Sequence, residues 1–197
     1  AIYGTLRSTN TALSAIVPNA RLLHGINVDH PDSLMSAFAQ SRPDIVINCV
    51  GLVKQLANAE DPLEAIPINS LLPHRLARLC ELANARLIHI STDCVFSGHK
   101  GNYSETDTPD ADDVYGRSKL LGEVDYPHAI TLRTSIIGHE LGGVRSLIGW
   151  FLNQTGCVKG YTKAIFSGVT TYELARVVRD FVIPNSKLHG LYHVAAE

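Results

Sequence analysis

The sequence has no apolar run close to the roughly 20 residues that a membrane-spanning helix needs. Its first residues hold no basic segment followed by an apolar one, so we predict no signal peptide. Positive charge is not in excess either, because 17 lysine and arginine residues stand against 19 aspartate and glutamate residues. There is therefore no electrostatic reason to expect a nucleic-acid or membrane partner. We expect a cytoplasmic protein that binds neither.

Cysteine is scarce, and its spacing does not suit a metal. No two cysteines have the close spacing of a metal or redox motif, and three of them lie in apolar or strand-like segments. We therefore expect free, buried thiols in a reducing compartment. The four are Cys49, Cys80, Cys94 and Cys157. The histidines His189 and His193 would stand roughly 13 Å apart on a strand, so we expect no metal site.

A glycine-rich turn is also lacking after the first strand pattern, residues 2–5. Dinucleotide-binding folds place such a turn before a helix whose N-terminus binds pyrophosphate. We expect the sequence to begin after that turn and to end before the last part of a substrate region. If the protein truly had no such turn, its binding of a dinucleotide would be badly weakened.

Strand patterns alternate with helical patterns along the chain, which indicates an α/β protein with a doubly wound parallel sheet. Ligands of such folds bind at the carboxyl ends of the strands. The predicted strands are residues 2–5, 22–28, 44–50, 87–92, 129–134 and 190–193. The predicted helices are residues 31–40, 68–83, 144–155 and 170–181, with one more that begins near Tyr115. We expect four residues of the third of these to face inward: Leu147, Ile148, Phe151 and Leu152. Residues 157–169 carry short strand patterns.

The stretch from Ser91 to Lys119 carries the chemistry. Ser91 and Thr92 end a predicted strand, and Tyr115 and Lys119 are four residues apart, so they share one helix face. An ammonium about 4 Å from a phenol contributes roughly 4 kcal/mol, which would lower the pKa of Tyr115 from about 10 to near 7. A phenol of that pKa would serve as a general acid or base, with Thr92 holding the substrate oxygen. The spacing alone is a weak signal, because a solvated helix with an amphipathic tyrosine shows it too.

The surrounding segments make the pattern specific. They are residues 88–98 (IHISTDCVFSG), 103–107 (YSETD), 115–123 (YGRSKLLGE) and 132–135 (LRTS). With these segments the sequence resembles the extended short-chain dehydrogenase/reductases, and within them the dTDP-4-dehydrorhamnose reductase branch. The resemblance implies a Rossmann-like NAD(P)-binding domain over residues 1–140. Residues 141–197 would then form a mixed region with part of the substrate site.

The resemblance also implies roles for individual residues. Thr92, Tyr115 and Lys119 would be catalytic. The adenine would lie against Asn27 and Val28, and the nicotinamide ribose beside Asn48, Cys49, Val50 and Gly51. Further cofactor contacts would come from Ser91, Tyr115, Lys119 and Arg133. The substrate would contact Thr92, Val95, Phe96, Tyr115 and Thr134.

Two of these assignments have structural alternatives. Arg133 could equally form a structural ion pair. Asn69, near the start of a predicted helix, could cap that helix or support the catalytic helix from a buried position.

The end of the first strand favours NADP over NAD. An acidic residue there would bind the ribose 2′-hydroxyl of NAD, whereas an arginine suits the 2′-phosphate of NADP. The candidates are Thr5, Arg7 and Ser8, with no acid among them. A surface arginine after a strand is the structural alternative, and NAD stays open as a cofactor.

Our first hypothesis is therefore a reductase that passes a hydride from NADPH to the C4 carbonyl of a 4-keto-deoxysugar nucleotide, with Tyr115 as proton donor. Asp93 beside Thr92 leaves an epimerase or dehydratase open. A regulatory subunit that kept the fold and binds NADP without turnover is the third reading. The sequence does not name the sugar or the nucleotide, and a homodimer is only one candidate assembly.

Overall fold

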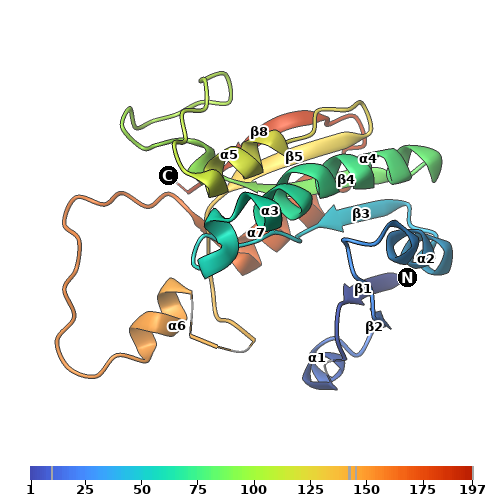
Figure 1. Cartoon of the computed structure of the whole chain (residues 1–197), viewed down its shortest axis with the longest axis horizontal. Coiled ribbons are helices and arrows are strands. Elements are labelled where there is room, and N and C mark those ends of the chain that lie inside the picture. Colours follow the sequence, from blue (N-terminus) through green and yellow to red (C-terminus); the bar gives the residue numbers. More distant parts are fainter. Residues whose placement is uncertain (10, 142, 145, 197) are drawn as a thin grey trace.

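The computed structural model describes residues 1–9, 11–141, 143–144 and 146–196. Its central sheet contains four parallel strands in the order β3 (Ile45–Asn48), β4 (Arg86–Thr92), β5 (Ala129–Thr134) and β8 (Gly190–Val194). Two further parallel pairs accompany it, β1 (Ile2–Leu6) with β2 (Ala20–His24), and β6 (Ile136–Ile137) with β7 (Val169–Thr170). The prediction of an α/β protein built on parallel strands is confirmed (Figure 1).

Helices cover both faces of the four-stranded sheet (Figure 1). On one face α2 (Pro31–Ser41) and α4 (Leu72–Leu82) bury Leu34, Leu72 and Leu76 with Leu87 of β4. On the other face α7 (Thr171–Val177) and the π-helical η4 (Val178–Val182) pack on Ile88 and Ile130. Because strand side chains alternate between faces, β4 needs apolar residues at successive positions to be buried on both sides.

The remaining helical segments are short. They are α1 (Thr11–Ile16), η1 (Ala57–Glu60), α3 (Pro62–Ala65), the π-helical η2 (Ile66–Leu71), η3 (Asp93–Val95), α5 (Val114–Leu121) and α6 (Leu147–Leu152). Segments α3, η2 and α4 follow one another without a break. Asp61 caps their start by accepting a hydrogen bond from Leu63 N at 2.9 Å, and Pro62 occupies the first helical turn.

Several sequence predictions were wrong in detail. The strand predicted at residues 22–28 ends at His24, because Gly25 has a φ of +76° and turns the chain away. No strand forms in residues 157–168. The predicted inward residues of α6 are not buried, and Leu147, Phe151 and Leu152 are all more than half exposed. Helical spacing shows which side chains share a face, but not that another element covers that face.

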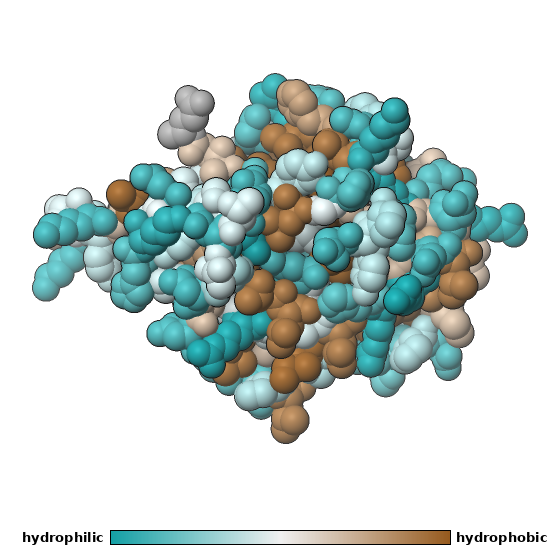
Figure 2. All heavy atoms as spheres, turned by 90° about the horizontal axis from the view of Figure 1, so that it is seen from above, coloured by the Kyte–Doolittle hydropathy of each residue, from teal (hydrophilic) through white to brown (hydrophobic). Residues whose placement is uncertain are grey.

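The cysteines also differ from expectation, since only Cys80 is buried, while Cys49 and Cys157 are exposed. Apolar side chains recur on the surface, and Figure 2 shows brown groups among the teal ones on the face seen from above. Within the described part of the chain, no helix combines the length and apolarity that crossing a bilayer requires. The same residues hold no group of three or more side chains suited to binding a metal.

Candidate active site

The predicted site residues meet at one edge of the sheet. Asn48 ends β3, Thr92 ends β4 and Thr134 ends β5. The register pairs Thr92 with Thr134, so β4 and β5 end level, and it pairs Asn48 with His89, so β3 ends three positions before Thr92. Parallel strands put their carboxyl ends on the same side, which is where such sheets bind ligands.

Helix α5 is fixed against the loop that follows β4. Asp113 caps it by accepting from Gly116 N at 2.6 Å. A Cβ on Gly116 would lie 2.4 Å from the carbonyl oxygen of Cys94 and 2.6 Å from Ala111 Cβ, so only glycine fits. This close approach holds the first turn of α5, and with it Tyr115, beside the end of β4.

Thr92 is anchored at the end of β4. Its hydroxyl oxygen accepts a hydrogen bond from Cys94 N at 3.1 Å and donates one to Asp93 Oδ1 at 3.2 Å. The side chain also hydrogen-bonds the phenol of Tyr115. Two hydroxyl groups on two elements are therefore brought together, as the sequence predicted.

Tyr115 is protonated at neutral pH. Only 9% of the residue is exposed, and this burial raises the pKa of Tyr115 to about 12, with Thr92 opposing the shift. The nearby Cys94 and Asp93 raise it further. The expectation that Lys119 would lower this pKa to near 7 was wrong, because burial, which disfavours the charged phenolate, is the largest influence on it.

Lys119 lies on α5 and is 5% exposed. Its Nζ donates a hydrogen bond to the carbonyl oxygen of Ile90 at 3.0 Å. Burial lowers the pKa of Lys119 to about 8, and the carboxylate of Glu123 opposes that shift. The ammonium is thus mostly charged at pH 7. Among the described residues this is its one side-chain hydrogen bond, so donors remain for a bound ligand.

Glu123 is a site residue that the sequence reasoning did not single out. Its carboxylate accepts from Arg133 at 2.8 Å and 2.7 Å, and from the Ser91 hydroxyl at 2.8 Å. Arg133 is 5% exposed, so the guanidinium forms the structural ion pair that was its alternative role. A signal was available, since Glu123 ends the segment of residues 115–123 on which the resemblance rests.

Asn69 supports the catalytic helix from a buried position. It is 1% exposed, accepts from Leu52 N at 2.9 Å and donates to Ser118 Oγ at 3.1 Å. It therefore ties the turn after β3 to α5. The alternative, a helix cap, is not what the structure shows.

Six of the predicted cofactor residues lie at two places, the turn after β3 and the end of β1. Residues 48–51 form the turn after β3, with Asn48 buried and Cys49 and Val50 exposed. Arg7 and Ser8 are exposed directly after β1.

Two others have structural roles of their own. Asn27 lies in a turn beyond β2, where its Oδ1 accepts from Asp29 N at 3.2 Å. Val28 packs against the core.

A cavity of about 770 Å³ is lined by Asp93 and Cys94, the two residues that follow Thr92. Phe96 and Thr134, two of the predicted substrate contacts, line it, and Phe96 stacks on Tyr103 with ring centroids 4.3 Å apart. The prediction for Val95 was wrong, because its side chain is fully buried and its carbonyl accepts from Ala111 N at 3.1 Å. The short helix η3 turns Val95 inward and leaves Phe96 to face the cavity.

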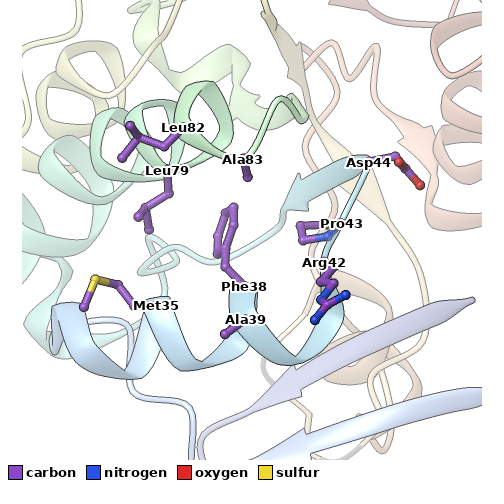
Figure 3. A pocket seen from close by; sticks show the side chains of 9 residues that line it. All are labelled: Met35, Phe38, Ala39, Arg42, Pro43, Asp44, Leu79, Leu82 and Ala83. Atoms are coloured by element: carbon purple, nitrogen blue, oxygen red, sulfur yellow. The ribbon is translucent and has the colours of Figure 1, made fainter.

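A second cavity, of about 530 Å³, lies between α2 and α4 (Figure 3). Met35 and Phe38 of α2 face Leu79 and Leu82 of α4 across it. Asp44, which lines it, precedes β3, so this cavity lies at the edge of the sheet opposite to Asn48. None of the predicted site residues lines it.

The turn after β3 fits a dinucleotide. A Cβ on Gly51 would lie 3.3 Å from Asn69 Oδ1 and 3.7 Å from Lys119 Nζ. Glycine therefore lets the main chain pass close to the ammonium, and Lys119 keeps N–H donors that suit ribose hydroxyls. The residues present are compatible with a nicotinamide cofactor held by Lys119 and this turn.

Comparison with known proteins gives related sequences and folds. The family model described as RmlD substrate binding domain matches residues 5–197. The probable low-salt glycan biosynthesis reductase Agl14 of Haloferax volcanii is 32% identical over 186 residues, which cover 89% of this chain and 61% of that protein. A dTDP-4-dehydrorhamnose reductase of Mycobacterium tuberculosis is 39% identical over 101 residues, covering 47% of this chain and 33% of that protein.

Two other similarities bear on the alternatives. Methionine adenosyltransferase 2 subunit beta of Danio rerio is 26% identical over 185 residues, 87% of this chain and 56% of that protein. The crystal structure of a dTDP-4-dehydrorhamnose reductase from Bacillus anthracis in complex with NADP superposes with a TM-score of 0.78 at 21% identity, over 98% of this chain and 74% of that one. This last similarity concerns the fold. The chain thus spans less than two thirds of the curated relatives named here.

Proposed function

This chain belongs to the family of RmlD substrate binding domains, and from that membership we propose that it carries the catalytic centre of a nicotinamide-dependent reductase of nucleotide sugars. One observation carries the proposal. A buried, protonated phenol, Tyr115, hydrogen-bonds the hydroxyl of Thr92, and the next two residues, Asp93 and Cys94, line a cavity of about 770 Å³. Two hydroxyl groups in this arrangement can both hydrogen-bond the carbonyl oxygen of a ketone.

The residues act on that oxygen in the following way. A bound reduced nicotinamide supplies the hydride. Thr92 and Tyr115 hydrogen-bond the carbonyl oxygen and orient it. As negative charge develops there, the O–H bond of Tyr115 breaks and its proton moves to the new carbinol oxygen. Lys119 holds the ribose of the cofactor and places a positive charge beside the phenolate that remains.

The raised pKa of Tyr115 suits its proposed role as a proton donor. A phenol with a pKa of about 12 keeps its proton at neutral pH and gives it up to an alkoxide, which is a far stronger base.

The proposed substrate is a 4-keto-deoxysugar nucleotide. The mycobacterial relative is named for such a compound, and the Haloferax relative is named as a glycan biosynthesis reductase. The proposed cofactor is NADPH in preference to NADH. Arg7 and Ser8 at the end of β1 support that preference, because an arginine suits a 2′-phosphate and no acidic side chain stands there.

The test measures binding and then turnover. NADPH and NADH are titrated into the protein by fluorescence, and a dTDP-4-keto-6-deoxysugar is added to the complex. We expect tighter binding of NADPH, and oxidation of it only when the sugar is present. A protein that binds neither cofactor would contradict the proposal.

The same assay distinguishes two other candidate functions from the proposed reductase. The zebrafish relative is named as a subunit of methionine adenosyltransferase, so a subunit that binds cofactor without turnover is the second candidate. It would bind NADPH and leave it unoxidised with every 4-keto sugar nucleotide offered. An epimerase or dehydratase, which the contact of Asp93 with Thr92 keeps open, would convert a sugar nucleotide with no net oxidation of cofactor.

A further inference from the structure

His89 is a buried histidine that the mechanism above does not use. It lies in the middle of β4 and is fully buried. Since strand side chains alternate, it shares the face of Leu87 and Ser91, which is the face covered by α4 and α5. Its ring atom Nδ1 lies 3.1 Å from Nδ2 of Asn48, its register partner on β3.

The hydrogen bonds around Asn48 determine which nitrogen of His89 carries the proton. Asn48 Oδ1 accepts from Val50 N at 3.1 Å, and a main-chain N–H can only donate. The amide of Asn48 must therefore point its NH₂ group toward His89. An NH₂ group is a donor, so His89 Nδ1 must be an unprotonated acceptor. The single ring proton must then lie on Nε2, which is buried and has no hydrogen-bond partner among the described residues.

We infer that His89 is a positioning residue that locks the amide of Asn48, and through Val50 the turn of residues 48–51, in the shape that receives the cofactor. The inference rests on the proposed function for the role of that turn. Asn48 is 2% exposed, so without His89 its NH₂ group would lose its partner inside the protein. His89 would then no longer hold the amide in this orientation, and a flipped amide would turn its NH₂ group toward Val50 N, where two donors cannot form a hydrogen bond.

This arrangement requires a neutral imidazole. The charged groups that act on His89 are Lys119 of α5 and His74 of α4, and both disfavour a second positive charge. Burial has the largest effect, and together these lower the pKa of His89 to about 3. An imidazolium would also point a donor at the NH₂ group of Asn48. His89 therefore holds the turn without titrating at physiological pH.

The first measurement does not depend on any cofactor. In the full chain labelled with ¹⁵N at histidine, we expect the His89 ring to show an unprotonated Nδ1 and a protonated Nε2 at every pH from about 5 to 8, because a pKa near 3 keeps it neutral. Protonation of Nδ1, or titration of the ring in that range, would overturn the inference.

The second measurement tests the role of the turn. The variant His89→Asn can place its Oδ1 where Nδ1 stood and accept from Asn48, whereas His89→Leu cannot. We expect His89→Leu to weaken NADPH binding roughly five- to tenfold, with turnover at saturating cofactor within about twofold of the wild type. We expect His89→Asn to bind within about twofold of the wild type. Unchanged binding in His89→Leu, or equal losses in both variants, would overturn the inference.

Thr131→Val is the matched control for stability. Thr131 is fully buried on β5 and hydrogen-bonds Val124, so its loss should lower the melting temperature without affecting NADPH binding. A wild-type protein that binds no NADPH would contradict the proposed function and the cofactor role of the turn. The protonation state of the ring would still decide whether His89 locks Asn48.

Discussion

Lys119 donates a hydrogen bond from Nζ to the carbonyl oxygen of Ile90 at 3.0 Å, which joins the catalytic helix to the strand that ends in Thr92. Ile90 is two residues before Thr92, so the bond also sets the position of the ammonium relative to the predicted catalytic hydroxyl. The ammonium is anchored by the protein before any ligand arrives. An anchored group loses little conformational entropy when it binds a ribose.

Replacement of Tyr115 by phenylalanine should remove the proton donor and little else. General acid catalysis contributes about 10²- to 10⁴-fold, so turnover of NADPH should fall by that factor while NADPH binding stays close to wild type. Stopped-flow oxidation of NADPH measures the turnover, and fluorescence titration measures the binding. Tyr172→Phe is the control, because Tyr172 is 72% exposed on α7. Full turnover in Tyr115→Phe would show that another group donates the proton.

Cofactor binding should weaken as the pH rises through about 8. The pKa of Lys119 is lowered to about 8, so above that pH the residue loses its charge. The variant Lys119→Arg keeps its charge, and its weaker binding should stay constant between pH 7 and 10. Fluorescence titrations across this pH range measure the cofactor affinity of both proteins. An equal pH dependence in both proteins would assign the titration to a group other than Lys119.

The same lysine makes a prediction for stability. Its pKa is about 8 in the folded protein against 10.5 ordinarily, so the unfolded chain binds more protons between these values. The buried charge therefore costs up to about 3 kcal/mol below pH 8, and this cost disappears as the pH rises toward 10.5. Urea unfolding of the wild type and Lys119→Met should show the wild type gaining stability relative to the variant over that range. If the two proteins differed in free energy of unfolding by the same amount at every pH, the lowered pKa would not belong to Lys119.

Glu123→Gln should destabilise the fold strongly. The carboxylate neutralises the buried guanidinium of Arg133, and removal of one partner of a buried pair costs about 3–5 kcal/mol. The double variant Glu123→Gln with Arg133→Met should recover much of that loss, because no buried charge is left unpaired. Glu81→Gln is the control, since the pair of Arg78 and Glu81 is exposed and should contribute less than about 1 kcal/mol. Chemical denaturation measures all three variants.

Gly122→Ala should destabilise the protein through steric overlap. A Cβ at Gly122 would lie 1.9 Å from the carbonyl oxygen of Asn69 and 3.2 Å from Pro73 Cγ, so α5 would have to move away from the preceding helix. Such overpacking costs about 1–3 kcal/mol or more. Gly160→Ala is the control, because a Cβ there would meet no atom within 4 Å. Equal melting temperatures for the two variants would show that the helices can separate freely.

Arg7→Ala should separate the two cofactors. If Arg7 binds the 2′-phosphate, the variant should bind NADPH roughly tenfold more weakly and NADH as before, since a hydrogen bond to a charged group contributes about 1.5–3 kcal/mol. Fluorescence titration with each cofactor measures the ratio. If Arg7→Ala weakened the binding of both cofactors equally, or of neither, Arg7 would not bind the 2′-phosphate.

Local spacing in the sequence was enough to predict where the catalytic groups lie. Ser91 and Thr92 end β4, and Tyr115 and Lys119 share one face of α5, as their positions in the strand and helix patterns indicated. The capping residue Thr170 also starts α7, with its hydroxyl accepting from Glu173 N at 3.1 Å. These features depend on neighbours within one turn or one strand, which a sequence displays directly.

Other features were settled only by contacts between distant segments. The partner of Arg133, the inward turn of Val95 and the exposure of α6 each depend on which element packs against which. Helical spacing in residues 147–152 predicted an apolar face, but within the described chain that face meets no covering element. A pattern shows what can be buried, whereas burial itself requires a second surface.

The sequence by itself determined the type of fold, the order of strands and helices along the chain, and where the proposed catalytic residues lie on them. The tertiary structure decided the protonation state of those residues. Burial, and not the neighbouring ammonium, controls the pKa of Tyr115, and it also lowers that of Lys119. The reason is that the free energy of a charge depends on the water removed around it, and this dehydration results from the packing of segments far apart in the chain.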